Sequence, residues 1–434
     1  MATLEQLLRI LARQGVAQSK GLAGELGVSQ PTLSRLVAAA GDRICRMGRA
    51  RGTRYARTRS LAGLGSRLPV YRVTEAGKPE QHGVLTLLEG GRHWLETPRG
   101  DTLFEGLPPF AVDMGPQGYV GRALGARYPE LGLPPRIVDW NEDHQLLFLA
   151  RRGEDCVGNL LIGQESLDRF LASTLVPVER SSYPELVRRS AQAQPGSSVG
   201  GEHPKFLAYV DGRHVLVKFV GDDEGAAARR WRELLVCEAL ALEVVREAGL
   251  EAARAHCFVE RGHGFLEVER FDRVGPRGRR GMVSLLALDN EYVARHGATR
   301  WAQVAPSLHE QGFIGADDVR RVRWLDVFGQ LIGNTDRHFG NLSFLETEEG
   351  RLRLAPIYDM LPMMFAPSGT TLVERAFEPE PPTSSTLEVW SDAALHAHRY
   401  WTRLIERPEL GAELRSLARA CRDALDRVRE QAPI

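Results

Sequence analysis

Two carboxylates and one amide lie in the C-terminal third of the chain, at a spacing that suits phosphoryl transfer. Asp336 is followed five residues later by Asn341, and Asp359 comes after a further hairpin-length interval. A nucleoside triphosphate brings clustered negative charge, which Mg²⁺ must neutralise, and Mg²⁺ prefers hard oxygen ligands. A separate carboxylate must accept the proton of the attacking hydroxyl group. The residue types and their order therefore predict a phosphotransferase site.

Elements that would position these residues flank them on both sides. Residues 324–332 (WLDVFGQLI) are apolar at helical spacing and predict a buried helix that leads into the loop. Residues 342–345 and 352–357 predict two paired strands, with a turn at residues 348–350. Helix, loop, hairpin and second Asp is the order of a protein-kinase catalytic region, whose loop shares the D-x-x-x-x-N core. That core alone also occurs by chance in ordinary turns, so the flanks are needed for the prediction.

Composition limits the classes of protein to consider. The length of 434 residues predicts two or three domains, and a net charge of zero argues against a whole-molecule electrostatic nucleic-acid binder. The five cysteines are scattered without a C-x-x-C pair, which indicates neither a disulfide framework nor a zinc site. No signal-peptide pattern and no apolar run of membrane-spanning length is present, so we expect a cytoplasmic protein with no membrane partner.

Residues 1–60 resemble a winged helix-turn-helix. Three short amphipathic segments predict helices, and GELGVSQPTLSRLV is similar to the helix-turn-helix of bacterial regulators. Seven arginines follow between residues 43 and 59, around two predicted strands whose tip is at residues 48–52, and they would lie along DNA phosphates. The alternative is a dimerisation or docking module with a solvated basic surface. The residues predicted to contact DNA are Gln30, Thr32, Ser34 and Arg35 of the third helix and Arg49 and Arg51 of the wing.

The segment from residue 67 to residue 185 is predicted to be mostly β. Short strands are expected at residues 70–73, 83–88 and 94–97, separated by glycines and charged turns. No cluster in this segment has catalytic spacing. The adjacent polar residues Glu142, Asp143 and His144 indicate the start of a helix rather than a set of metal ligands.

Residues 186–300 contain features that a nucleotide site would need. Residues 196–205 (GSSVGGEHPK) are rich in glycine and serine, which let backbone amides approach phosphates, although a flexible linker would have the same composition. Lys218 lies in the apolar strand VLVKFV, where burial requires a phosphate or an acid as partner. The alternative is an edge strand whose lysine reaches solvent. Glu233, Glu238 and Glu243 of the following helix are candidate partners, and Glu238 has the most apolar surroundings.

Residues 265–271 and the C-terminal residues 387–434 show patterns that predict which of their side chains are exposed. Residues 265–271 (FLEVERF) predict a strand in which Glu267 and Glu269 alternate with apolar residues and suggest one polar face. The C-terminal residues 387–434 predict two or three amphipathic helices that complete a helical lobe. His396 and His398 are two residues apart and would not face each other on a helix, so we expect surface residues rather than a metal site.

Several motifs together resemble the HipA family of bacterial serine/threonine kinases. LVKF, VERFDR, LIGNTDRHFGNLSF and LAPIYDM occur in that family's order, and GSSVGGEHPK is similar to its phosphate loop. The N-terminal helix-turn-helix points to the YjjJ-like subgroup, in which a DNA-binding head is fused to the kinase. The resemblance implies an α+β, HipA-like two-lobed protein-kinase-like fold with an N-terminal winged helix-turn-helix domain.

The resemblance also implies roles for single residues. Asp336 would be the catalytic base, Asn341 and Asp359 the Mg²⁺ ligands, and Ser198 the autophosphorylated serine, whose added charge would disfavour ATP. A lysine often found beside the catalytic-loop asparagine is replaced by Gly340. Either Arg337 or His338 could supply its positive charge, or activity would be low. The ATP-binding residues would be Gly200, Gly201, Glu202, His203, Pro204, Lys205, Lys218, Glu269, Arg270, Phe271, His338 and Tyr358.

The resulting prediction has four parts: residues 1–60 bind DNA as a winged helix-turn-helix domain, 67–185 form a mostly β N-terminal subdomain of the HipA-like region, 186–300 form the nucleotide-binding part of the kinase core, and 301–434 form the helical catalytic lobe. The predicted function is that of an ATP- and Mg²⁺-dependent, autophosphorylating serine/threonine kinase of HipA toxin type, autoregulated through DNA.

Its expected partners are DNA and a protein substrate, with an aminoacyl-tRNA synthetase or another translation component suggested by the best-known HipA kinases. A homodimer would fit the reading of paired half-sites. Two alternatives stay open: a transcriptional regulator whose kinase-like domain senses nucleotide without transferring phosphate, and a kinase of small molecules.

Overall fold

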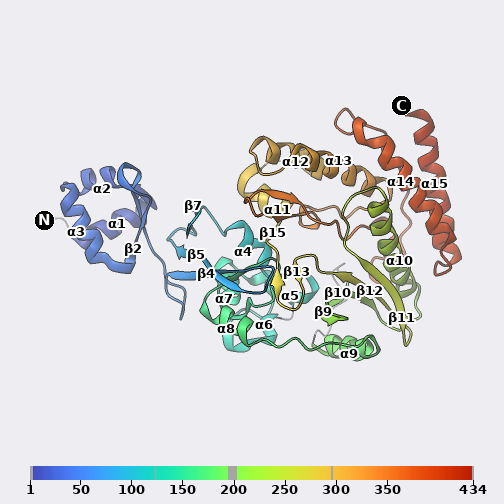
Figure 1. The fold of residues 1–434 in the computed structure, drawn as a ribbon, viewed down its shortest axis with the longest axis horizontal. Helices are drawn as coiled ribbons and strands as arrows, with labels where there is room; N and C mark the ends of the chain where they lie inside the picture. Colours follow the sequence, from blue (N-terminus) through green and yellow to red (C-terminus); the bar gives the residue numbers. More distant parts are fainter. Residues whose placement is uncertain (1–2, 123, 194–202, 295–296, 433–434) are drawn as a thin grey trace. The chain divides into compact units, whose positions relative to one another are not determined.

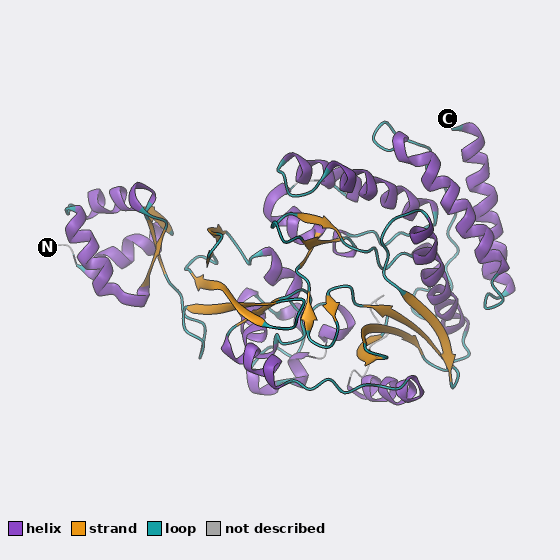
Figure 2. Cartoon of the chain, viewed as in Figure 1, coloured by secondary structure: helices purple, strands orange, loops and turns teal. Residues whose placement is uncertain are grey.

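The computed structural model describes residues 3–122, 124–193, 203–294 and 297–432, which divide into two compact mixed α/β units (Figures 1 and 2). The first unit comprises residues 1–74, 78–115 and 128–173, and the second comprises residues 75–77, 116–127 and 174–434. The four-part division predicted from the sequence is finer than these two units and stays a prediction.

The N-terminal head consists of three helices and a small antiparallel sheet (Figure 1). Thr3 and Gln6 form a capping box at the start of the first helix, and Gly27 ends the second helix with a left-handed backbone. The apolar sides of the helices meet in a core around Leu7, Leu11 and Leu33. The elements are α1 (Leu4–Gln14), α2 (Ser19–Leu26), α3 (Gln30–Ala40) and a sheet in the order β1 (Val16–Gln18), β3 (Arg54–Arg57), β2 (Ile44–Met47).

A five-stranded antiparallel sheet and three helices form the rest of the first unit. Asn141 and His144 form a capping box at the start of α7, which confirms that residues 142–144 begin a helix. The sheet order is β7 (Gly100–Phe104), β6 (His93–Thr97), β5 (Pro79–Leu87), β4 (Arg67–Val73) and β8 (Leu160–Ile162). The helices are α4 (Pro109–Met114), α7 (Glu142–Arg152) and α8 (Gln164–Ala172).

Within this unit the head packs on the five-stranded sheet through an apolar cluster that contains Met47 and Ala56 of the head and Leu88 and Trp94 beyond it. Arg59 reinforces the contact, because its guanidinium binds Asp143, the His93 ring at 2.9 Å and the carbonyl oxygen of Leu88 at 3.1 Å. The basic run that ends the head is therefore partly used to join it to its neighbour.

The second unit contains a four-stranded antiparallel sheet, which lies beside α10 in Figure 1. Its order is β11 (Ala255–Glu260), β12 (His263–Glu269), β10 (Arg213–Val220) and β9 (Lys205–Val210). One face packs on the long helix α10 (Ala226–Glu247) through Val220, Leu266 and Val268. The other face packs against α9 (Tyr183–Ala193) through Val217 and Phe265.

The α9 side of this sheet corrects one expectation. Glu267 does not belong to a polar exposed face, because its residue is only 3% exposed. Its carboxylate accepts hydrogen bonds from the guanidinium of Arg180 at 2.8 Å and from the hydroxyl of Tyr183 at 2.8 Å. Arg180 and Tyr183 lie more than 80 residues earlier in the chain, so the strand pattern alone could not reveal them.

The remainder of the second unit is mainly helical. In Figure 1, α13, α14 and α15 pack against one another in chain order, around a core that includes Phe328, Tyr400 and Trp401. His396 is buried in this packing, with its ring 5.7 Å from that of Trp324, so the expectation of a surface residue was wrong. The helices are α11 (Leu285–Leu288), α12 (Trp301–Glu310), α13 (Ala316–Leu331), α14 (Leu387–Glu406) and α15 (Ala412–Gln431).

Small elements complete the second unit. The hairpin predicted after the catalytic loop is present as β16 and β17, which pair from Phe344 opposite Leu354. The remaining elements are α5 (Gly118–Arg122), α6 (Leu124–Arg127), β13 (Arg273–Val274), β14 (Gly278–Arg279), β15 (Met282–Ser284), β16 (Ser343–Glu346) and β17 (Leu352–Leu354). Among the described residues, no helix combines the length and the apolar character needed to span a membrane.

Candidate active site

Lys218 is the centre of a buried ionic cluster. It extends from β10 on the α10 side of the sheet, and its ammonium lies 2.7 Å from both carboxylate oxygens of Glu238. The two side chains are 8% and 1% exposed. The preference for Glu238 is thus confirmed, since Glu233 pairs with Arg230 and Glu243 pairs with Arg403 instead.

Asp359 is the second acid bound to Lys218. Burial alone would raise the pKa of Asp359, but the positive charges of Lys218 and Lys205 lower it to about 2. Burial likewise opposes the charge on Lys218, yet Asp359 and Glu238 raise its pKa above the ordinary value. Burial raises the pKa of Glu238, against the pull of Lys218. The positive charges of Lys218 and Lys205 therefore favour the ionised form of Asp359.

The loop after α13 is connected to Asp359 through a side chain that the sequence did not single out. Asn334 is 1% exposed, and its side-chain oxygen accepts a hydrogen bond from the backbone nitrogen of Asp336 at 3.0 Å. Its side-chain nitrogen donates to the backbone oxygen of Asp359 at 3.4 Å. Asn334 therefore links the predicted base to the predicted metal ligand. Its position inside the motif was visible in the sequence, but its contacts were not.

Asn341 faces the same loop. Its side-chain nitrogen donates to the backbone oxygen of Asp336 at 2.8 Å, and the residue is buried. This bond leaves the amide oxygen as the atom that could bind a cation. Among the described residues, no group of three or more His, Cys, Asp or Glu side chains is arranged to hold a metal. A cation here would depend on Asn341 and Asp359, a small oxygen set of the kind that Mg²⁺ accepts together with water and phosphate.

Two aromatic rings lie beside this cluster. Tyr358 donates its hydroxyl to the backbone oxygen of Gly340 at 2.8 Å, and its ring centroid is 5.7 Å from that of Phe271. Both rings pack on the apolar cluster between the sheet and α10. Of the predicted ATP-binding residues 269–271, Glu269 ends β12, and the guanidinium of Arg270 binds Asp272 at 3.0 Å.

The described end of the glycine-rich segment contains an unsatisfied polar atom. The ring nitrogen Nε2 of His203 is buried and has no hydrogen-bond partner among the described residues. Its ring lies 4.9 Å from that of Trp231, and burial lowers the pKa of His203 to about 3. Pro204 accepts a hydrogen bond from the backbone of Phe219 at 3.0 Å, and Lys205 lies opposite Lys218. The predicted site residues Ser198, Gly200, Gly201 and Glu202 lie outside the described residues.

The structure separates the two candidates for the charge of the missing lysine. Arg337 binds Asp326 on α13 at 3.2 Å and is largely buried. His338 is exposed, accepts a hydrogen bond from the backbone of Gly340 at 3.1 Å, and contributes to the lowered pKa of Asp359. Of the two, His338 is the one that acts electrostatically on Asp359.

The predicted DNA-binding residues lie on one helix and one turn of the head. Gln30, Ser34 and Arg35 are exposed on α3, and Thr32 is half-buried. Arg49 is exposed between β2 and β3. The side chain of Arg51 lies outside the part that the structure describes.

The sequence predicts that all seven arginines of the basic run lie along phosphates. The structure shows that at least two of them are bound to acids instead. Arg57 pairs with Glu89 at 3.1 Å, and Arg59 pairs with Asp143 while only 17% exposed. Arg46 and Arg49, by contrast, are exposed. The partners of Arg57 and Arg59 lie outside residues 1–60, which is why the arginine pattern could not predict their engagement.

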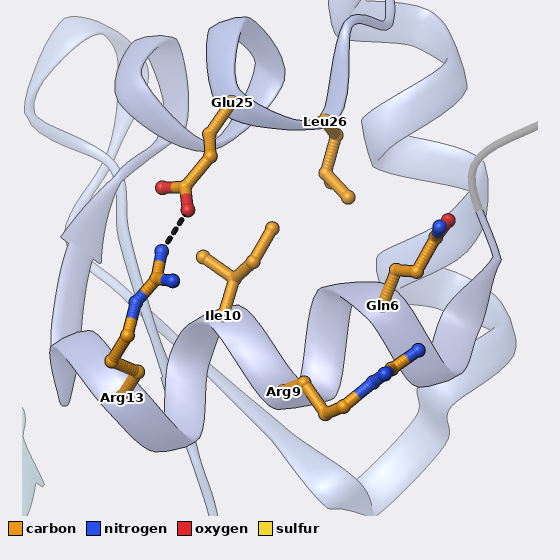
Figure 3. Close-up of a pocket in the computed structure, with 6 residues that line it drawn as sticks. All are labelled: Gln6, Arg9, Ile10, Arg13, Glu25 and Leu26. Atoms are coloured by element: carbon orange, nitrogen blue, oxygen red, sulfur yellow. Dashed lines mark hydrogen bonds and ion pairs between the residues drawn. The ribbon is translucent and has the colours of Figure 1, made fainter.

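A hollow of about 370 Å³ lies on a different face of the head helices (Figure 3). Ile10 and Leu26 point into it, and Arg13 of α1 closes one side through an ion pair with Glu25 of α2. None of the predicted DNA-binding or nucleotide-binding residues lines it.

Comparisons with known proteins agree with this geometry. Residues 197–433 match the family described as HipA-like C-terminal domain, and residues 64–171 match the YjjJ-like toxin, middle domain. The chain is 32% identical to Toxin YjjJ of Escherichia coli (strain K12) over 445 residues, which covers 97% of each chain. The chain therefore belongs to the HipA-like family and, within it, to the YjjJ-like toxins.

Solved structures give the corresponding fold. A Shewanella oneidensis MR-1 HipA, solved in a toxin–antitoxin complex with HipB and operator DNA, superposes with a TM-score of 0.54 at 16% identity. The match covers 84% of this chain and 97% of that chain. The Helicobacter pylori proinflammatory kinase CtkA matches 55% of this chain and 94% of its own at 16% identity, with a TM-score of 0.38 that defines no shared fold.

Proposed function

We propose that this protein is a serine/threonine protein kinase of HipA type, which uses ATP and Mg²⁺ and is coupled to DNA through its N-terminal head. The observation that carries the proposal is the chain of contacts from Lys218 to Asp359 and, through Asn334, to the backbone of Asp336. Such a chain brings a cation, an ionised carboxylate and a second carboxylate into one network, which are the groups that phosphoryl transfer needs.

The nucleotide would lie between the sheet and the catalytic loop. Phe271 and Tyr358 supply an aromatic and apolar site for a base, and residues 269–271 would offer backbone groups to adenine. Lys218 would bind the phosphates while Glu238 keeps its ammonium oriented. Pro204 and Lys205 belong to the same group of ATP-binding proposals, as do Gly200, Gly201 and Glu202.

Asp359 and Asn341 would hold Mg²⁺, which would neutralise the charge of the phosphates when bound. The low pKa of Asp359 supports this role because a cation requires an ionised ligand. The unsatisfied Nε2 of His203 supports a polar ligand near the phosphate loop. His338 would add a second donor beside Asp359.

The chain's own residues would perform the proton step. Asp336 would accept the proton of the acceptor serine or threonine hydroxyl, and the residue is exposed. The bonds from Asn334 and Asn341 to the backbone of Asp336 hold the loop in place before a substrate arrives. The acceptor protein, for which a translation component is our first candidate, and Ser198 as an autophosphorylation site both belong to this proposal.

The head is proposed to be a winged helix-turn-helix that binds DNA. Residues 1–60 contain eleven Lys and Arg against three Asp and Glu, although the whole chain is neutral. Gln30, Thr32, Ser34 and Arg35 of α3 would contact base edges, and Arg49 and Arg51 would contact phosphates. The HipA–HipB–DNA complex of the Shewanella relative is consistent with a link to DNA, which here would be made within one chain and, we propose, as a homodimer.

The decisive experiment measures the intact mass of the protein after incubation with ATP and Mg²⁺. The wild type should gain phosphate, mapped to Ser198, and should phosphorylate an acceptor protein. Asp336→Ala should lose transfer by at least about 10²-fold because the general base is removed, while nucleotide binding is retained. Asp317→Ala, an exposed acid at the start of α13, is the matched control and should behave as the wild type.

The outcome also distinguishes a second candidate function. The replacement of the family's lysine by Gly340 favours a domain that binds nucleotide without transferring phosphate. ATP binding with no gain of mass in the protein or in any acceptor would contradict the kinase proposal and support a nucleotide-sensing regulator. Full transfer by Asp336→Ala would contradict the assignment of the base.

A further inference from the structure

Arg337 follows the proposed catalytic base directly, and its side chain reaches back to the helix that precedes the loop. Its Nε donates to Asp326 of α13 at 3.2 Å, and the two side chains are 17% and 5% exposed. Its Nη1 donates to the backbone oxygen of Asn334. Arg337 thus ties two points of the loop to one helix.

The helix has a space that fits this side chain. Gly329 is buried in α13, and a Cβ atom added there would lie 2.6 Å from Cδ of Arg337 and 3.3 Å from Sδ of Met360. Glycine is unfavourable in a helix interior, so its presence needs a packing reason. Asp326 and Gly329 are three residues apart and share one face of the helix. Asp326 supplies a negative charge for the guanidinium of Arg337, and Gly329 leaves space for its aliphatic part; we call these two residues the seat.

The seat is itself fixed. The second carboxylate oxygen of Asp326 accepts a hydrogen bond from the backbone nitrogen of Ala302, at the start of α12, at 3.3 Å. Asn334, which Arg337 holds by its carbonyl oxygen, binds the backbone of both Asp336 and Asp359 through its side chain. The peptide that carries Asp336 is therefore restrained on its N-terminal side by Asn334 and on its C-terminal side by Arg337.

We propose that Arg337 is a positioning residue for the catalytic base, held by its ion pair with Asp326 and by its packing on Gly329 of α13. This inference rests on the proposed kinase function. Asp336 is carried by the loop that Asn334 and Arg337 restrain, so a displacement of this loop also displaces the carboxylate, and a misplacement of about 1 Å lowers the rate of a positioned reaction about 10²-fold. Arg337 does not contact the substrate in this proposal and acts through the loop.

The first test compares kcat with KM for ATP in Arg337→Met. We expect kcat to fall about 10- to 100-fold, with KM for ATP changed less than about 3-fold, because the phosphate-binding residues Lys218 and Asp359 are untouched. Arg321→Met is the matched control, since it also removes an arginine paired with an aspartate of α13, Asp318 at 3.1 Å. An unchanged kcat in Arg337→Met, or an equal loss in the control, would overturn the proposal.

The second test uses the space at Gly329. Gly329→Ala should displace Arg337 and lower kcat about as much as Arg337→Ala does. Gly329→Ala combined with Arg337→Ala should be no less active than Arg337→Ala alone, because the added methyl group then meets no arginine stem. If the losses of kcat in the two single variants multiplied in the double variant, the proposed packing of Arg337 on Gly329 would be overturned. Thermal unfolding of each variant checks that the chain is folded.

The two proposals fail in different ways. A wild type that binds ATP but transfers no phosphate to itself or to any acceptor overturns the proposed function and, with it, a catalytic role for Arg337. An active wild type whose Arg337→Met variant keeps its kcat overturns only the positioning role.

Discussion

The ionic cluster of the second unit and the basic surface of the head use charge in opposite ways. Lys218 and Glu238 are almost completely buried, and their charged atoms are in mutual contact. Arg46 and Arg49 of the head are exposed. Charge that is buried must be paired, and removing one partner leaves the other without compensation. Charge that is exposed contributes little to stability and is free to act on a partner at a distance.

The same contrast exists inside the head. Arg59 belongs to the same sequence run as Arg49, but its guanidinium is held by Asp143, His93 and the backbone of Leu88. The run is therefore divided into a part that faces solvent and a part that joins the head to the five-stranded sheet. Substitutions in the two parts should have different consequences, although the sequence presents them as one feature.

The largest effect is expected at Lys218. Lys218→Met should abolish phosphoryl transfer and lower the free energy of unfolding by about 3–5 kcal/mol, because Glu238 remains buried without its partner. Denaturant-induced unfolding and a transfer assay measure the two effects separately.

A double substitution sharpens this prediction. Lys218→Met combined with Glu238→Leu should recover most of the lost stability without recovering activity, since an apolar pair can replace a buried ion pair. Glu243→Gln on the same helix is the control, and it should change stability by less than about 1 kcal/mol because Glu243 is 41% exposed. A Lys218→Met variant as stable as the wild type would contradict the view that buried Glu238 depends on Lys218 as its partner.

The next largest effect is expected in the dependence of stability on pH, through the buried His93. His93 is fully buried, its Nδ1 donates to the backbone oxygen of Gly106 at 2.7 Å, and its Nε2 faces Arg59 at 2.9 Å. Burial lowers the pKa of His93 to about 4, and Arg59 contributes in the same direction. The unfolded chain binds this proton below a pH of about 6.5 and the folded chain does not, so stability should fall as pH falls from about 6.5 to about 4, by up to about 3 kcal/mol.

Hydrogen exchange of peptides covering residues 84–104 between pH 7 and pH 5 would measure this loss locally. His93→Gln should remove the pH dependence, whereas His256→Gln, an exposed histidine of the second unit, should leave it unchanged. A wild type whose exchange protection is constant over this range, after correction for intrinsic exchange, would contradict a neutral buried His93.

The Lys218–Glu238 pair was easier to predict from the sequence than the partners of Glu267 and Arg59. Lys218 and Glu238 could be matched because each lies in an apolar local pattern, which makes burial and therefore pairing necessary. The hairpin after residues 336–341 followed from its own alternation of apolar and polar residues. Local patterns of this kind report on the segment that contains them.

Glu267, His396 and Arg59 were misjudged for one physical reason. Each is covered or bound by residues on other elements: Glu267 by Arg180 and Tyr183, Arg59 by Asp143, and His396 by the ring of Trp324. Alternation and helical spacing describe which face a residue shares with its neighbours, but they do not tell whether another element covers that face. Asn334 was overlooked for the same reason, since its role depends on Asp359 across a hairpin.

The smallest effect on stability is expected at the exposed arginines of the head, where the proposed function is most sensitive. Arg49→Ala should change the free energy of unfolding by less than about 0.5 kcal/mol, because the side chain is exposed. It should weaken DNA binding nearly equally for all sequences and reduce the slope of log affinity against log salt by about 1, as expected for the loss of one phosphate contact.

Arg59→Ala is the matched comparison, because it removes an arginine from the same run. It should destabilise the first unit by about 1–3 kcal/mol, since Asp143 and His93 lose their partner, but it should leave the salt dependence of DNA binding unchanged. Salt-dependent binding measured by fluorescence anisotropy, beside thermal unfolding, separates the two outcomes. If Arg59→Ala changed the salt slope and Arg49→Ala did not, the division of the basic run would be reversed, and the surface facing DNA would have to include the joint with the five-stranded sheet.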